Sequence, residues 1–358
     1  MRFVKRMNYL QDIQLFKYHS TIGWYLILIT AFLAAPLVMG TYWVSLLILI
    51  GINIIVALGL NLVTGYTGQV SLGHAAFFAV GAYTSAVLTG KFGVSFWLAL
   101  PASGVVGALV GIVVGLPALR LKGLYLAIAT MGFGFIIEEI IVQWEPITNG
   151  VNGLSIKRPS LAAFSLASDK HFYYLVFPIV LLSVLVLKNL LRTSSGRAFL
   201  AIRDSETAAE SMGINLAVYK TAAFCISAFY TGIAGALFAH FMRFIGPENF
   251  TILESISFLV MILVGGLGSV HGSVFGAVFI TFLPEGISLS KDYLPTFIGQ
   301  QAGLQAAVYG LVLLLFIRFE PLGLYGRWLK IKFYFENFPF YKKDTFRKVR
   351  KFHRTQKQ

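Results

Sequence analysis

The chain has few charges, one cysteine and none of the common catalytic motifs. Charged residues make up 12% of its 358 residues, whereas soluble proteins carry about 25%. A single cysteine, Cys225, cannot form an internal disulfide. The sequence also lacks a Gly-x-x-x-x-Gly-Lys-Ser/Thr phosphate loop, a metal-ligand spacing and a readable nucleophile–base pair. We therefore expect no cofactor, no metal and no catalytic residue.

Long apolar runs dominate the sequence instead, because 57% of the residues are hydrophobic. A helix that spans a bilayer needs about 20 apolar residues, and the chain holds about ten such stretches. We predict an all-α integral membrane protein, a polytopic helical bundle of transmembrane segments with interrupted helices. The predicted spans are 22–39, 42–64, 71–89, 94–118, 123–143, 172–191, 219–243, 255–270, 272–289 and 301–317.

The net charge of +14 comes from Lys and Arg residues that cluster beside the apolar runs. This placement indicates membrane topology rather than nucleic-acid binding. If the spans alternate, most basic residues lie on one side, so both termini are expected to be cytoplasmic. The predicted parts are a basic N-terminus (1–21), a transmembrane domain (22–317) with a cytoplasmic segment at 192–218, and a basic tail (318–358). The tail either binds anionic lipid headgroups or only fixes topology.

A polar stretch interrupts the apolar sequence between the second and third predicted spans. Gly65-Tyr66-Thr67-Gly68-Gln69-Val70 is followed by Ser71-Leu72-Gly73-His74. Irregular backbone at membrane depth persists only where protein or a water-lined cavity covers it. We predict that this region lines a pathway for a polar solute, with the candidate residues Asn61, Gly65, Gly68, Gln69, Ser71 and His74.

Small residues at a spacing of four predict close helix packing. Each of two glycine sets is expected to form a flat stripe on one helix face: Gly107, Gly111 and Gly115, and then Gly268, Gly272 and Gly276. The pattern of Gly65, Gly68 and Val70 also recurs at 265–270. This similarity reflects either an internal repeat or chance.

The cytoplasmic segment 192–218 predicts a short capped helix. Asp204 or Ser205 suits the N-cap, and Glu206 suits the positive end of the helix dipole. Gly213 suits the left-handed residue that ends the helix. We expect one small apolar face, formed by Ala208, Ala209 and Met212. The helix is either a membrane-surface loop or a knob that fits a groove in a cytoplasmic partner.

Several of these stretches together resemble the permease subunits of branched-chain amino acid ABC importers, which are of the type II kind. The resemblance covers roughly residues 45–290. It rests on Asn61 to Phe77, Gly81-Ala82-Tyr83, Thr148 to Gly153, Gly196-Arg197-Ala198, Ala201 to Asp204, Ala208-Ala209, Gly213-Ile214 and Gly265 to Ser269.

The resemblance implies a multi-pass protein of the bacterial cytoplasmic (inner) membrane that is not itself an enzyme. It implies a second homologous permease subunit, two ATP-binding cassette subunits, an extracytoplasmic substrate-binding protein, surrounding membrane lipid and a small amino-acid substrate. The segment 204–213 resembles the family's coupling helix, which sits in a cleft of the ATPase. The residues expected to couple to the ATPase are Arg203, Asp204, Glu206, Ala208, Ala209, Glu210 and Gly213.

Other interpretations stay open at this point. Related permeases carry urea or short amides, and a proton-coupled secondary transporter or a membrane enzyme is a further alternative. Most remaining ionisable residues lie near span ends, where they can reach water: His240, His271, Glu254 and Glu285. Asn53 and Asn61 share one helix side and either join helices or line the pathway. The roles of Glu138 and Glu139 are left undecided.

Overall fold

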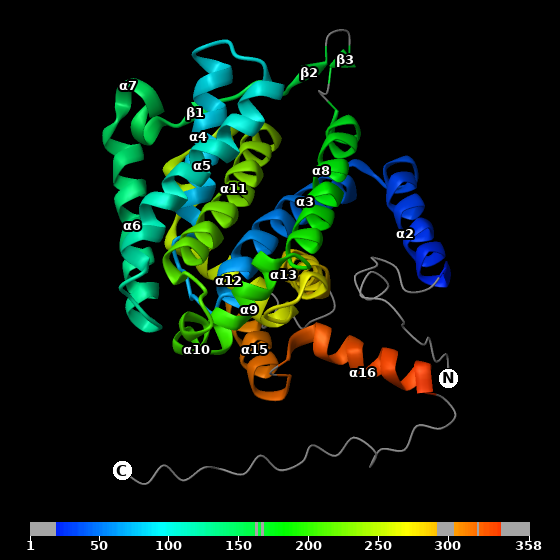
Figure 1. Cartoon of the computed structure of the whole chain (residues 1–358). Helices are drawn as coiled ribbons and strands as arrows, with labels where there is room; N and C mark the ends of the chain where they lie inside the picture. The colour runs from blue at the N-terminus through cyan, green and yellow to red at the C-terminus, as the bar shows by residue number, and fades with distance from the viewer. Residues whose placement is uncertain (1–18, 162–163, 166–167, 292–303, 321, 338–358) are drawn as a thin grey trace.

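The computed structural model describes residues 19–161, 164–165, 168–291, 304–320 and 322–337, and these are almost entirely helical (Figure 1). Two pairs of two-residue antiparallel strands complete the secondary structure: β1 with β4, and β2 with β3. The elements are α2 (His19–Val38), α3 (Thr41–Asn61), η1 (Leu62–Tyr66), α4 (His74–Gly90), α5 (Phe96–Ala118), α6 (Leu124–Gln143), α7 (Glu145–Thr148), η2 (Gly150–Asn152), β1 (Leu154–Ser155), β2 (Ser160–Leu161), β3 (Phe164–Ser165), α8 (Asp169–Leu190), α9 (Ser194–Asp204), α10 (Glu206–Ser211), α11 (Leu216–Met242), β4 (Phe244–Ile245), η3 (Pro247–Phe250), α12 (Ile252–Gly265), α13 (Val270–Lys291), α15 (Leu304–Phe319) and α16 (Gly323–Asn337).

Seven helical segments among the described residues are long and apolar enough to cross a membrane. The prediction of a helical, multi-pass membrane protein is therefore confirmed. The predicted spans 22–39 and 301–317 correspond to the shorter apolar stretches Gly23–Val38 and Ala307–Phe316, and residues 301–303 lie outside the described ranges. The predicted span 71–89 corresponds to α4, which has 17 residues and begins at His74. The seven segments are Thr41–Tyr66, Phe96–Ala118, Leu124–Gln143, Asp169–Leu190, Leu216–Met242, Pro247–Gly265 and Val270–Ser288.

The helices α3 and α11 form the centre of the bundle. The apolar side chains of α3 are buried along most of its length, and α3 packs against α8, α11 and α13. The helix α11 packs against α4 and α5. In contrast, α2 and α6 lie at opposite edges in Figure 1. The short helices α9 and α10 lie at the lower end in this view, and α7 lies at the upper end.

Glycines allow α5 and α11 to approach each other closely. A β-carbon at Gly107 would stand 2.6 Å from the carbonyl oxygen of Ala228. At Gly111 it would stand 2.7 Å from the Ala228 β-carbon, and at Gly115 it would stand 3.3 Å from Thr221 Cα. These three glycines therefore lie along one contact between two helices.

The second glycine set differs from its predicted arrangement. Gly272 and Gly276 lie on α13 and face α12, where β-carbons would meet Gly266 and Met261 carbonyl oxygens. Gly268 lies instead in the turn between α12 and α13, with a φ of +70°. This left-handed conformation ends a helix, so Gly268 cannot share a helix face with the other two.

Candidate functional site

The polar stretch between α3 and α4 is a break in the helical backbone, as the sequence predicted. The helix α3 ends in the π-helical turn η1, and α4 begins only at His74. Between these two helical segments, the backbone N–H of Gln69 donates to Val63 O over 3.0 Å, and Thr67 Oγ1 donates to the same oxygen over 2.5 Å. Gly68 has a φ of +74°, which only glycine adopts without strain.

The break reaches into the helix bundle. The Leu72 amide donates to Thr130 Oγ1 of α6 over 3.0 Å, and the Ala75 amide donates to Ser255 Oγ of α12 over 2.8 Å. Side chains of neighbouring helices therefore satisfy the exposed amides at the start of α4. This is the condition under which irregular backbone persists within a membrane.

His74 is fully buried at the start of α4. One ring nitrogen lies 3.1 Å from Ser71 Oγ, and the other lies 2.7 Å from Ser227 Oγ of α11. Both nitrogens thus have hydroxyl partners, and the histidine joins the break to α11. The side-chain amide of Gln69 is also buried, but neither its oxygen nor its nitrogen has a partner among the described residues.

The two similar glycine segments contact each other. A β-carbon at Gly65 would stand 2.4 Å from the Gly268 nitrogen, so neither backbone leaves room for a side chain there. Asn61 fixes this contact, because its Oδ1 accepts from the Gly268 amide over 2.9 Å. Its Nδ2 donates to Ser269 O and Ser273 Oγ over 2.9 and 2.7 Å. Asn61 therefore joins helices rather than facing an open pathway.

Arg203, in the last turn of α9, reaches this glycine contact. Its Nη1 donates to the Gly65 carbonyl oxygen over 3.2 Å. A β-carbon at Gly68 would stand 3.2 Å from Arg203 Cγ, and one at Gly268 would stand 2.8 Å from Nη1. The guanidinium thus connects α9 to both glycine segments. The sequence predicted a contact between Arg203 and the ATPase, but in the structure the side chain points into the protein.

The short helix α10 has the predicted ends. Ser205 Oγ accepts a hydrogen bond from the Ala208 amide over 3.3 Å, which makes Ser205 the N-cap. Gly213 has a φ of +81°, and the following amide of Ile214 donates to Ala209 O over 3.0 Å. These contacts confirm the expected capped helix.

The predicted apolar face of α10 is wrong. Ala209 is buried against the protein, whereas Ala208 is exposed and Met212 is 83% exposed. Ala208 and Met212, four residues apart, therefore lie on the outward side, whereas Ala209 faces the bundle. The outward surface of this segment includes Asp204, Ala208, Glu210 and Met212.

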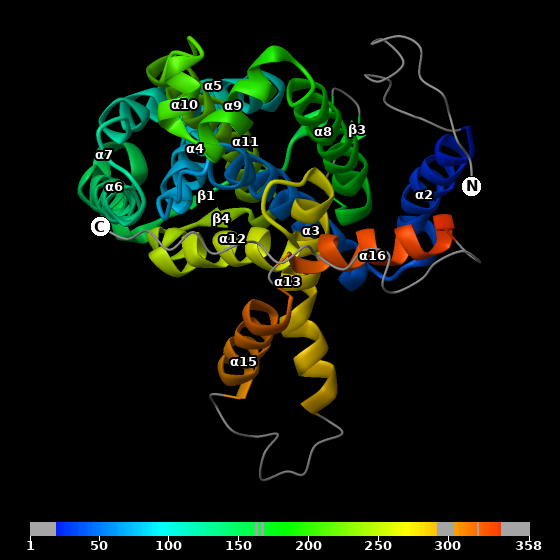
Figure 2. The ribbon, with the colours of Figure 1, turned by 60° about the horizontal axis from the view of Figure 1, so that its bottom comes forward.

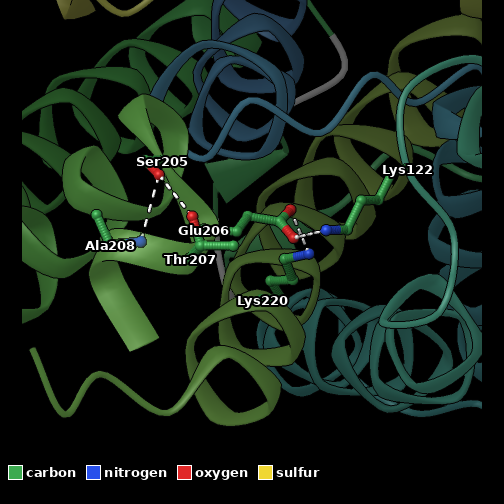
Figure 3. A network of polar contacts seen from close by, with 6 residues as sticks. All are labelled: Lys122, Ser205, Glu206, Thr207, Ala208 and Lys220. Carbon is green, nitrogen blue, oxygen red and sulfur yellow. Dashed lines mark hydrogen bonds and ion pairs between the residues drawn. The ribbon is translucent and has the colours of Figure 1, made fainter. Parts of the chain in front are cut away.

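Glu206 anchors α10 to two other elements (Figure 3). One carboxylate oxygen lies 2.5 Å from Lys220 Nζ of α11, and the other lies 3.0 Å from Lys122 Nζ in the α5–α6 connection. Burial acts to raise the pKa of Glu206, but the bonds from Lys220 and Lys122 outweigh it and hold the pKa below its ordinary value. No spacing in the sequence indicates this arrangement, because Lys122, Glu206 and Lys220 come from three separate elements.

A hollow of about 600 Å³ opens beside this ion-pair network. It lies between the α5–α6 connection, α10 and the start of α11. Its lining residues are Leu119, Lys122, Glu206, Glu210, Gly213, Ile214, Asn215, Leu216, Ala217 and Lys220.

Several other polar residues pair with side chains of other helices. Asn53 Nδ2 donates to Thr281 Oγ1 over 2.9 Å, which joins α3 to α13. Among the residues that the structure describes, no group of three or more His, Cys, Asp or Glu side chains could hold a metal ion. Further pairs are His240 with Ser85, His271 with Tyr25, Glu285 with Tyr42, and Glu139 with Gln143.

Comparisons with known proteins identify the family. Residues 42–317 match the family model described as "Branched-chain amino acid transport system / permease component". The chain is 38% identical to the high-affinity branched-chain amino acid transport system permease protein LivM of Escherichia coli, over 73% of this chain and 68% of the relative. It is 27% identical to the probable branched-chain amino acid transport permease protein LivH of Methanocaldococcus jannaschii, over 78% of this chain and 90% of the relative.

A third relative matches a shorter part. The xylose transport system permease protein XylH of Escherichia coli is 34% identical over 38% of this chain. No solved structure matches the chain. The family model covers well over half of the sequence, and the chain therefore belongs to the family of permease components of branched-chain amino acid transport systems.

Proposed function

We propose that this chain is the membrane-spanning permease of an ATP-driven importer that carries branched-chain or related amino acids across a bacterial cytoplasmic membrane. The family and its LivM and LivH relatives support the cargo class. The existence of two kinds of related permease supports pairing with a second, homologous permease subunit. Two ATP-binding subunits below and an extracytoplasmic binding protein above complete the proposed complex.

Both termini are proposed to be cytoplasmic, with ten membrane crossings. The basic residues near the ends of the apolar segments support this orientation. The helices α2, α4 and α15, of 20, 17 and 16 residues, would supply the three crossings beyond the seven long segments. In this orientation α9 and α10 face the cytoplasm, at the opposite end of the bundle from α7 (Figure 1).

The outward side of α10 is the proposed contact with the ATPase. Ala208 and Met212 offer a small exposed apolar surface, flanked by the exposed carboxylates of Asp204 and Glu210. The network of Glu206 with two lysines holds the opposite side of α10 to the bundle. A push on α10 is therefore passed to α5, α6 and α11 rather than absorbed by a loose loop.

Arg203 links this segment to the helix break between α3 and α4. Its guanidinium contacts the Gly65 carbonyl and lies against Gly268. A movement of α9 and α10 would thus shift both glycine segments together. We propose that this shift changes access along the pathway that Gly68, Gln69, Ser71 and His74 help to shape.

The buried amide of Gln69 supports a polar role for the break. A buried amide without partners is rare in folded proteins, and such groups usually meet water or a ligand. An amino acid carries an ammonium and a carboxylate, so its passage requires polar groups of this kind at membrane depth. We place Gln69 among the groups that hydrogen-bond water or substrate in the open state.

Transport by the reconstituted complex tests this function. We expect proteoliposomes that contain the permease pair, the ATPase subunits and the binding protein to move labelled leucine only when ATP is present on the ATPase side. Uptake that follows a proton gradient without ATP would instead show a secondary transporter. Competition by unlabelled leucine, urea and acetamide distinguishes amino-acid cargo from small amides.

A further inference from the structure

The helix α16 contacts the turn between α12 and α13, two of the predicted membrane-spanning helices. It begins at Gly323, four residues after α15 ends at Phe319. Four residues of extended chain span at most about 14 Å. A β-carbon at Gly323 would stand 2.6 Å from the Gly266 nitrogen, so α16 starts directly on the α12–α13 turn. Its N-terminal end is therefore fixed at the end of the helix bundle.

The longest apolar stripe of α16 has four residues, and two more apolar residues, Leu329 and Phe333, lie on the opposite side of the helix. Leu324, Trp328, Ile331 and Phe335 recur at the spacing of a single helix face. Leu324, at the start of this stripe, is half-buried, and the Trp328 ring is 49% exposed but lies 6.2 Å from the Phe275 ring of α13. In the second half, Ile331 is 49% exposed and Phe335 is 72% exposed. The stripe thus continues beyond the protein surface that supports its beginning.

The direction of α16 explains this exposure. Figure 2 shows α16 running outward from the α12–α13 turn, at the start of α13, towards the side where α2 lies. In Figure 1 it lies below the bundle and runs across the direction of the crossing helices. Because α16 runs across the crossing helices at the end of the bundle, we expect it to lie along the bilayer surface.

Basic side chains accompany the stripe. Arg327, Lys330 and Lys332 lie within the same four turns. Two acidic residues, Glu320 and Glu336, leave one excess positive charge over residues 320–337. The Glu320 carboxylate lies 2.6 Å from Arg327 Nε and 3.7 Å from Lys330 Nζ. Long basic side chains can keep their apolar stems on a hydrophobic surface while their charges reach lipid phosphates. An apolar stripe with flanking Trp, Tyr, Lys and Arg is typical of helices that lie in a membrane interface.

We propose that α16 lies in the membrane–water interface and binds anionic phospholipid headgroups. Ile331 and Phe335 would enter the boundary between headgroups and acyl chains, and Arg327, Lys330 and Lys332 would face the phosphates. Lipid is the expected partner because the stripe begins beside α13, one of the helices long and apolar enough to cross a membrane, and because the excess charge of residues 320–337 is positive. This binding is independent of the cargo and of ATP coupling.

The position of α16 gives this binding a consequence for the rest of the protein. The Leu322 carbonyl and Tyr325 side chain surround Gly266, where a β-carbon would stand 2.9 and 3.2 Å from them. The neighbouring Gly268 contacts Gly65 and Arg203. Lipid that holds α16 therefore also holds the α12–α13 turn against the helix break.

Depth measurements on the whole protein in vesicles test the proposal. Cys225→Ala removes the native cysteine, and Phe335→Cys provides a site for an environment-sensitive fluorophore. Met212→Cys, on the exposed side of α10, is the matched control. The vesicles contain either phosphatidylcholine alone or phosphatidylcholine mixed with phosphatidylglycerol.

We expect a lipid-bound nitroxide to quench the label at residue 335 strongly, and a water-soluble quencher to act mainly at residue 212. Lys330→Gln together with Lys332→Gln should raise the phosphatidylglycerol content needed for half-maximal quenching, since each basic residue near an anionic surface contributes about fivefold to binding. Equal access of the water-soluble quencher to both sites would overturn the proposal. Protection of residue 335 from both quenchers in the assembled complex would also overturn it, because a protein partner would then cover α16.

Discussion

Replacing Arg203 by alanine is the sharpest perturbation of the link between α9 and the helix break. The change removes the hydrogen bond from Nη1 to the Gly65 carbonyl oxygen, which spans 3.2 Å. It also removes the aliphatic stem that lies against Gly68. Hydrogen bonds from charged groups contribute about 1.5–3 kcal/mol. The side chain is 38% exposed, which favours the lower end of this range.

A coupling loss of about 1.5 kcal/mol corresponds to about tenfold. We therefore expect Arg203→Ala to lower leucine transport per ATP hydrolysed by about this factor, with little change in assembly. The assay is simultaneous measurement of ATP hydrolysis and leucine uptake by the reconstituted complex. Co-purification of the ATPase shows whether assembly is retained.

Arg197→Ala is the matched control for this experiment. Arg197 is exposed on the same helix α9, and its Nη1 donates to the Arg192 carbonyl oxygen over 3.5 Å, within its own segment. Exposed charged contacts contribute little to stability, so transport per ATP should stay close to that of the wild type. If Arg203→Ala behaves like Arg197→Ala, the Arg203 guanidinium does not carry the coupling.

Three further changes test other parts of the structure. Gly68→Leu should block uptake, because a side chain at φ +74° would meet the Arg203 stem 3.2 Å away. The control Gly93→Leu has a φ of +63° and open space around it, so it should leave uptake intact, and equal uptake by both variants would contradict the site. Gly111→Ala should lower the melting temperature of the protein in detergent, because overpacking against α11 costs about 1–3 kcal/mol. The control Gly132→Ala has no atom within 4 Å of the new β-carbon and should not change it, so matching melting temperatures would argue against close packing. The stability difference between wild type and Glu206→Gln should hold from neutral pH to about the ordinary carboxyl pKa of 4.5 and disappear as pH falls through the lowered pKa; a difference that vanishes near neutral pH would show that Glu206 has no lowered pKa.

Local signals in the sequence predicted much of the fold. Apolar run length indicated the spanning helices, and the glycines with polar neighbours indicated the break before His74. The ends of α10 followed from Ser205 and Gly213, since caps depend on residues only a few positions away. The match between the two glycine segments also had a structural counterpart in the contact of Gly65 with Gly268.

Features that depend on distant parts of the chain were not predictable in this way. The direction of Arg203 is set by two glycine segments from opposite parts of the sequence. The pairing of Glu206 with Lys122 and Lys220 joins three separate elements, and no spacing signals it. The burial of Ala209 depends on which side of α10 meets the bundle, which the six-residue helix does not reveal by itself.

The most direct test of the whole arrangement is the side of the membrane on which α10 lies. In a Cys225→Ala background, Met212→Cys marks the exposed side of α10, and Trp144→Cys marks the opposite end of the bundle, where the tryptophan is 53% exposed. In intact cells that produce the permease without its ATPase subunits, a membrane-impermeant thiol reagent should label residue 144 at once and residue 212 only after the membrane is opened. Labelling of residue 212 in intact cells would place α10 outside, where no ATPase could reach it.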